Sequence, residues 1–495
     1  MGDIRLKFWC WWLANCIASM RNPYSSLSVP DPTPAFFLVA IAAVLVWVVG
    51  DAGWLSLLIV GVAVAPFLIY QLFTRPMANI AVLVVAASMP RFFAEIGGVK
   101  ARPEHIAVGL VGLATLYWWR RNRELTVWMK ADFLLLLYVA CNYVSSTFMS
   151  ISPGQTIKWA TQQLLVILPY FFLRVFLTSD WRFRKALEIV LLAGVMEAAY
   201  ALLCFYSNRF FGTTFGMEQD QYGIIPGTYG TQLEANILGS TSAACLVMLL
   251  TLYFKERNPR FLIGAAIAYA GMAISLSRAA VLAAGVSLLL LLIYALRSKI
   301  TTRQVITRAA LTLLAVTLVL APTLISLYNE RFSTVDVNNV AADDNTRSRV
   351  LTIAIAYDNI VEHPILGNGT ASFQLSFEAK DFGYFDLDQA GWIGNTEIRV
   401  LYDMGLVGIV VFSLFLWNLA RPAWKLIKQE HSAELLGLLL SAIAYCISFQ
   451  FTEGTLLAFS WVHLGLIACG VALLKNKEHI AFERGLLPGT AGSHV

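Results

Sequence analysis

Apolar blocks about as long as a bilayer is thick recur along most of this chain, and they constrain its fold more than any other feature. A transmembrane helix needs roughly 20 consecutive, mainly apolar residues. The chain is 58% hydrophobic and only 14% charged, whereas a soluble domain carries about 25% charged residues. The blocks do not show the alternation of a half-buried strand. The sequence therefore predicts an all-α polytopic membrane protein with about 12–14 transmembrane helices.

Candidate spans can be placed from the apolar blocks alone. They lie at about 35–50, 53–70, 77–90, 105–119, 131–149, 160–177, 185–206, 234–254, 261–276, 279–296, 306–327, 398–419, 433–451 and 455–474.

The charges between the spans give the orientation. Loops on the cytoplasmic side carry an excess of Lys and Arg. If the N-terminus is cytoplasmic and the spans alternate, most of the 36 Lys and Arg fall in cytoplasmic segments. A miscounted helix would move later loops to the wrong side and erase this bias. We expect a multi-pass protein of the bacterial inner (cytoplasmic) membrane with both termini cytoplasmic.

The same layout divides the chain into five parts. A cytoplasmic segment with an interfacial helix near 8–20, rather than a cleavable signal peptide, precedes the first block of helices. A long loop outside the membrane separates that block from the last three helices, and a cytoplasmic tail follows. The parts are 1–34, 35–328, 329–397, 398–474 and 475–495.

The long loop at 329–397 contains more acidic than basic residues. Loops of this length are usually functional or disordered. Residues 349–362 carry apolar positions at helical spacing, which predicts an amphipathic helix inside the loop. His363-Pro364 and the glycines Gly367 and Gly369 then end that helix.

Several function classes are excluded or unsupported. The net charge of +5 is small and its basic residues are scattered in short clusters, so nucleic acid is not an expected partner. Neither a P-loop nor a dinucleotide fingerprint is present. The seven cysteines lie in apolar stretches without metal-ligand spacing, so we expect no disulfide framework, no metal and no cofactor. Oligomeric state is left unknown.

Five polar positions could bind substrate or take part in chemistry, and each also has an ordinary structural reading. Arg278, at the tip of the 261–296 hairpin, is either an interfacial arginine or a phosphate clamp, since a guanidinium matches phosphate geometry. Arg347 and Arg349 are either solvated or a second clamp. Asn236 is a helix cap or, with the turn at Gly227, part of a substrate site.

His363 most simply shapes the turn before Pro364, and a substrate contact is its functional reading. His105 and His463 lie on apolar faces and are expected to pack there.

The order of several short motifs resembles the O-antigen ligase/polymerase family of bacterial envelope glycan assembly. Each motif is weak alone, but together they are fairly specific. They are Gly227-Thr228-Tyr229, Glu234-Ala235-Asn236, Ser277-Arg278, Arg349, His363-Pro364-Ile365-Leu366-Gly367-Asn368-Gly369, and the run from Asn395 to Gly408. The first ~200 residues match only in hydropathy.

The resemblance implies a glycosyltransferase without a metal cofactor that takes an undecaprenyl-diphosphate-linked glycan. Ligases of the family transfer the glycan to lipid A-core, and polymerases join repeat units, on the periplasmic side. Arg278 would then bind the diphosphate, and Arg349 matches a basic position in the loop. Family ligases commonly have a histidine directly before the asparagine that matches Asn395, where this chain has Gly394.

Since that histidine is the presumed base, Glu397 becomes the candidate base, with Asp403 as a weaker one. Two other classes of function stay open. The first is a transporter or lipid-linked glycan flippase, although the sequence lacks the internal repeat that marks many transporters. The second is an assembly subunit that keeps the family fold without catalysis.

Overall fold

The computed structural model describes residues 68–96, 99–122, 127–217, 227–298, 300–332, 344–375 and 393–483. The interfacial helix expected near 8–20, the span at 35–50 and nearly all of the span at 53–70 lie outside these ranges. The middle of the long loop also lies outside them.

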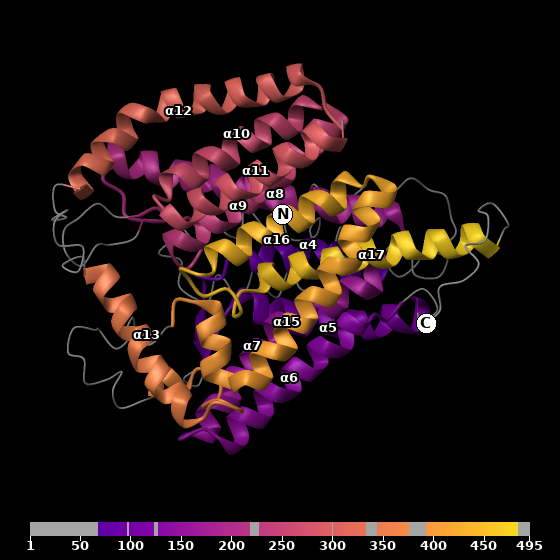
Figure 1. Ribbon diagram of the computed structural model, residues 1–495, viewed down its shortest axis with the longest axis vertical. Coiled ribbons are helices and arrows are strands. Elements are labelled where there is room, and N and C mark those ends of the chain that lie inside the picture. Colours follow the sequence, from indigo (N-terminus) through magenta and orange to yellow (C-terminus); the bar gives the residue numbers. More distant parts are fainter. Residues whose placement is uncertain are drawn as a thin grey trace, which may run out of the picture. The chain divides into compact units, whose positions relative to one another are not determined.

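Every predicted span within the described residues corresponds to a helix (Figure 1). The helices are α4 (Pro76–Ala87), α5 (Pro103–Asn122), α6 (Lys130–Phe148), α7 (Pro153–Phe176), α8 (Asp180–Phe211), α9 (Ala235–Glu256), α10 (Pro259–Ile274), α11 (Arg278–Ser298), α12 (Arg303–Phe332), α15 (Thr396–Glu430), α16 (Ala433–Ser448) and α17 (Ala458–Glu483).

The protein is an all-α polytopic membrane protein. In the described residues eight helices, α6, α7, α8, α9, α11, α12, α15 and α17, are long and apolar enough to cross a membrane, and α4, α10 and α16 are shorter apolar helices. Proline occupies the first turn of α4, α7 and α10, where its missing N–H costs nothing.

A small β-hairpin is a feature that the sequence analysis did not predict. Strands β1 (Ala94–Ile96) and β2 (Val99–Ala101) pair antiparallel, with Ala94 opposite Ala101. At three residues each, the strands are too short to give a clear alternating pattern in the sequence.

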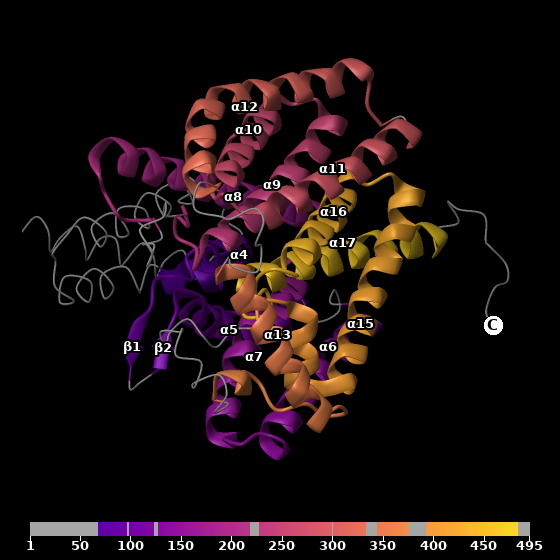
Figure 2. The same cartoon turned by 60° about the vertical axis from the view of Figure 1, so that its left-hand side comes forward.

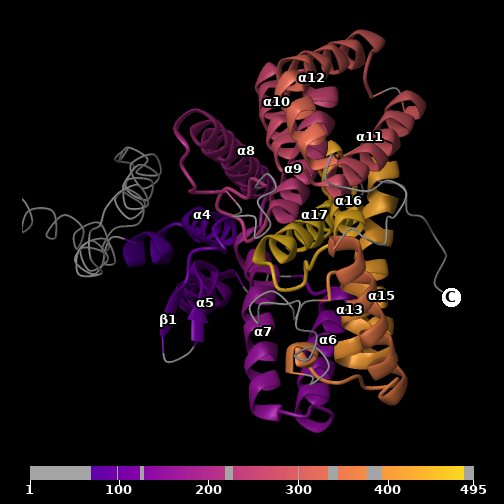
Figure 3. The ribbon, with the colours of Figure 1, turned by 90° about the vertical axis from the view of Figure 1, so that its left-hand side faces the viewer.

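Helix α9 is the most enclosed of the long apolar helices in the described chain. Its apolar window is 94% buried, and it packs against α8, α10, α11 and α16. Helix α15 lies along α6, and α17 lies along α7 (Figures 2 and 3). Because a bilayer gives no hydrophobic drive for helices to associate, close packing of small residues has to hold them together.

The amphipathic helix expected in the long loop is present as α13 (Asp344–Glu362), which begins five residues before the predicted start. It packs against α15 through a buried cluster of Ala356, Ile360, Phe373, Ile393 and Tyr402. The loop therefore contains a helix seated on the beginning of α15.

The turn after α13 meets a break in α15. Gly405 has φ 63° and ψ −162° inside the helix, a conformation that essentially only glycine adopts. The break frees backbone groups, which pair with the preceding turn. Leu406 N–H donates to Pro364 O at 2.8 Å, and Gly369 N–H donates to Asp403 O at 3.0 Å.

Replacing Gly405 with alanine is expected to destabilise the protein by more than about 1 kcal/mol. The added Cβ would lie 2.3 Å from Ile365 O, and backbone atoms cannot move aside cheaply. Gly285→Ala is the matched control, because a Cβ there meets nothing within 4 Å. Thermal unfolding of both variants in detergent compares them, and equal midpoints would contradict a strained Gly405.

Candidate functional site

Arg278 is the first residue of α11 and follows a tight turn from α10. Ser275 Oγ accepts from Ser277 N–H, and Ser277 Oγ accepts from Ala280 N–H, both at 3.3 Å. The latter bond caps the helix in the usual way. The Arg278 side chain is exposed. Arg278 therefore stands at the turn between two helices, as the sequence predicted, but α10 and α11 each pack against α9 rather than along each other.

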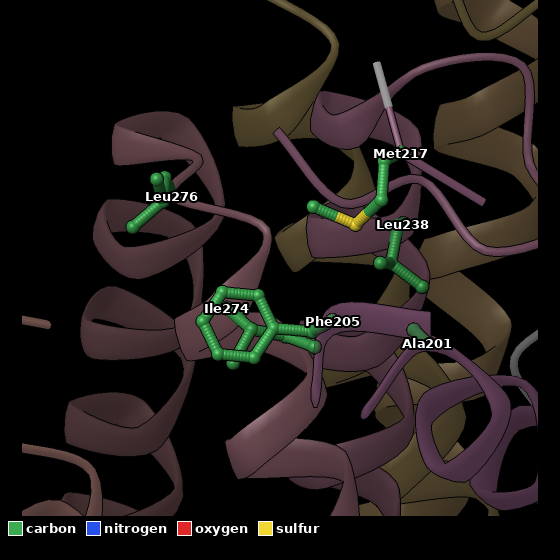
Figure 4. Packing of buried hydrophobic residues seen from close by; sticks show 6 residues of the cluster. All are labelled: Ala201, Phe205, Met217, Leu238, Ile274 and Leu276. Atoms are coloured by element: carbon green, nitrogen blue, oxygen red, sulfur yellow. The ribbon is translucent and has the colours of Figure 1, made fainter. Parts of the chain in front are cut away.

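Leu276 fixes the direction of this turn. Its φ of 55° is left-handed, which costs a non-glycine residue energy. Its side chain is buried in a cluster that α8, the segment after α8, α9 and the end of α10 form with it (Figure 4). The cluster consists of Ala201, Phe205, Met217, Leu238, Ile274 and Leu276. Burial of the Leu276 side chain offsets the backbone strain, so the buried cluster fixes the turn that precedes Arg278.

Close packing brings Asn236 toward the same turn. A Cβ on Gly239 of α9 would lie 2.7 Å from Ser275 Oγ and 2.8 Å from Ser277 Cβ, so α9 and the Arg278 turn are in contact. Asn236 precedes Gly239 by three residues and therefore shares its face of the helix. Asn236 is half-buried and does not cap α9, because Glu234 occupies the N-cap position without a side-chain capping bond.

The segment from Gly227 to Glu234 is anchored by a buried acid. Glu197 of α8 accepts from Thr231 N–H at 2.8 Å and also from the Thr231 hydroxyl. Gly230 has φ 61°, and a Cβ there would lie 2.5 Å from Glu197 Oε1. That glycine thus makes room for the Glu197 carboxylate.

Arg91 holds the other side of this segment. Its guanidinium lies 3.6 Å from the centre of the Tyr229 ring and donates to Leu233 O at 2.9 Å. Gly227 is half-buried at the start of the segment, and Thr228 pairs with Met217. Both ends of the turn are therefore fixed before α9 begins.

Asn395 and Glu397 are joined through a third residue. Asn395 caps α15, with its Oδ1 accepting from Ile398 N–H at 2.9 Å. Its Nδ2 donates to Gln450 Oε1 at 3.0 Å, and Gln450 Nε2 donates to Glu397 Oε1 at 2.6 Å. Glu397 is exposed. Gln450 belongs to the loop between α16 and α17.

A buried ion network lies one turn further along α15. Arg399 is 3% exposed; its Nε lies 3.3 Å from Asp403 Oδ2, and its Nη1 lies 2.8 Å from Glu453 Oε2. Asp403 Oδ1 also accepts from Ala371 N–H at 3.1 Å. Both carboxylate oxygens of Asp403 therefore make structural contacts. This argues against Asp403 as the general base.

Sequence reasoning missed Arg399 and Glu453. The available signal for Arg399 and Asp403 was a basic residue and an acid at i and i+4 near the start of an apolar block. Glu453 had no such signal, since 54 residues separate it from Arg399 and only the fold places it there.

The loop from Phe449 to Leu457 connects the two groups of candidate residues. Thr452 Oγ1 donates to Glu234, two residues before Asn236. Gln450 contacts Asn395 and Glu397. This loop therefore contacts both the start of α9, at Glu234, and the start of α15, at Asn395 and Glu397.

The remaining candidates lie in or after α13. Arg347 and Arg349 stand in its first two turns. His363 is half-buried and shapes the turn that follows, where its carbonyl accepts from Gly367 N–H at 3.0 Å. Gly394 has room for a side chain, because a Cβ there would meet only Phe451 O, at 3.8 Å.

Within the described ranges, no group of three or more His, Cys, Asp and Glu side chains is arranged so that it could hold a metal ion.

Residues 263–413 match the family model described as O-antigen ligase. The match begins in α10, includes Arg278, α13, Asn395 and Glu397, and ends beyond the break in α15. It supports membership of the O-antigen ligase/polymerase family and a glycosyl-transferring membrane function of the O-antigen ligase type. Asn236 and Gly227 lie before the matched residues. No curated protein matches the chain.

Proposed function

We propose that this protein is a membrane glycosyltransferase that transfers or polymerises a glycan carried on undecaprenyl diphosphate, in cell-envelope polysaccharide synthesis. The acceptor is a growing glycan or lipid A-core, and the reaction takes place on the periplasmic side of the inner membrane. The observation that carries the proposal is the exposed Arg278 at the capped start of α11, inside the family-matched region.

The chemistry of this position suits a diphosphate. Backbone N–H groups at a helix N-terminus attract anions, and a guanidinium adds paired, charge-assisted hydrogen bonds to phosphate oxygens. Arg347 and Arg349 on α13 are proposed as further basic contacts. Asn236, Gly227, His363 and Asn395 are proposed to contact substrate. Arginines neutralise phosphate charge by themselves, so the proposed mechanism uses no metal.

The proposed step is a single displacement. An acceptor hydroxyl oxygen attacks the anomeric carbon, and the bond from that carbon to the diphosphate oxygen breaks. The electron pair leaves with undecaprenyl diphosphate, whose developing charge Arg278 stabilises. Glu397 takes the acceptor proton. Since Glu397 is exposed, an acceptor can reach its carboxylate.

A strain lacking the gene tests the proposal. Lipopolysaccharide and secreted polysaccharide are profiled beside the parent strain. Single repeats are expected for a lost polymerase, and full-length glycan left on the carrier for a lost ligase. A carrier-linked glycan trapped on the cytoplasmic side would instead indicate a flippase, and unchanged profiles would contradict both.

A further inference from the structure

Gln450 lies between two of the residues assigned to the proposed site and contacts both through its side-chain amide. Its Oε1 accepts from Asn395 Nδ2 at 3.0 Å, and its Nε2 donates to Glu397 Oε1 at 2.6 Å. The same Nε2 lies 3.2 Å from Cys446 O. Both ends of the amide are therefore engaged.

The direction of these bonds is determined by the start of α15. The backbone N–H of Ile398 can only donate, so the Asn395 atom 2.9 Å away is the amide oxygen. The Asn395 nitrogen must then face Gln450, which turns the Gln450 oxygen toward Asn395 and its nitrogen toward Glu397. A carboxylate accepts this last bond, so every donor in the chain meets an acceptor.

The rest of the loop does not depend on the Gln450 side chain. Thr396 N–H donates to Phe449 O at 3.0 Å, and Asn395 Nδ2 lies 3.3 Å from the Gln450 backbone carbonyl. Thr452 contacts Glu234, and Glu453 pairs with Arg399. These contacts hold the loop against α15 and α9 even without the glutamine amide.

We propose that Gln450 is a positioning residue that orients the Glu397 carboxylate. This inference rests on the proposed function of Glu397 as the base. A donor on Oε1 fixes the carboxylate plane and leaves Oε2 for the acceptor hydroxyl.

The experiment uses the purified full-length protein in lipid nanodiscs. The probe is the polyprenyl-diphosphate-linked glycan extracted from the deletion strain, and the readout is the polyprenyl diphosphate released, followed as rate against glycan concentration. The variants are Gln450→Leu, Glu397→Gln and the double variant. Gln155→Leu, at an exposed glutamine at the start of α7, is the matched control.

Gln450→Leu is expected to lower kcat about 10- to 100-fold with little change in KM. Gln155→Leu should behave as wild type. In the Glu397→Gln background, Gln450→Leu should add little, because the two residues act as one unit.

Contrary results separate the two claims. A wild-type protein that releases no carrier overturns the proposed function. If the wild type is active and Gln450→Leu has an unchanged kcat, the positioning role alone is overturned. Additive losses in the double variant also overturn it and make the glutamine merely structural.

Discussion

Replacing Arg278 with alanine is expected to abolish transferred or polymerised glycan while the protein remains folded in the membrane. A preorganised donor that stabilises transition-state charge contributes about 10²–10³ in rate, and Arg278 is the basic side chain at the capped start of α11. Its exposed guanidinium supports no packing, so stability should hardly change. Lysine should restore only part of the activity, because it lacks the planar fork.

Arg297→Ala is the matched control, since Arg297 is exposed in the last turn of the same helix. Carrier release in nanodiscs and glycan profiles in the complemented deletion strain measure the effect. Normal glycan from Arg278→Ala at wild-type protein levels would remove Arg278 from the proposed mechanism.

Replacing Arg399 with methionine is expected to cost about 3–5 kcal/mol of stability. The substitution leaves the buried Asp403 carboxylate and the half-buried Glu453 carboxylate without their cation. A buried unpaired charge is far more costly than a missing hydrogen bond. The loop from Phe449 to Leu457 should become more mobile, because Glu453 loses its ion pair with Arg399. Activity should fall together with folded protein rather than separately.

Thermal unfolding in detergent and the amount of protein extracted from membranes measure this effect. A variant carrying Arg399→Met with Asp403→Asn and Glu453→Gln is the informative companion, because it removes both stranded charges. It should recover much of the lost stability. A single variant as stable as wild type would show that the network contributes little.

The sequence predicted where most of the candidate site residues lie along the chain, but not which of them are in contact. The motifs around Arg278, His363 and Asn395 fall within the family-matched region, and the helix expected at 349–362 is present as part of α13. Local signals were enough for these, since caps, turns and helical spacing act over a few residues. The roles assigned to these residues stay predictions.

Two glycine-containing turns showed a further structural role once distant residues were placed. The glycine turn before α9 receives the Glu197 carboxylate at Gly230. The glycines after α13 allow the backbone to cross α15 at Gly405. In both cases the sequence showed where glycine was needed, but the neighbour that needs the space comes from another helix.

The sequence by itself determined that this is a polytopic helical membrane protein, because backbone groups in lipid must be satisfied within each helix and an apolar block therefore predicts its own structure. Only the tertiary structure decided which polar side chains meet. Gln450, Thr452 and Glu453 reach Glu397, Glu234 and Arg399 across long separations in the chain. Such contacts depend on how helices pack, and no local pattern encodes them.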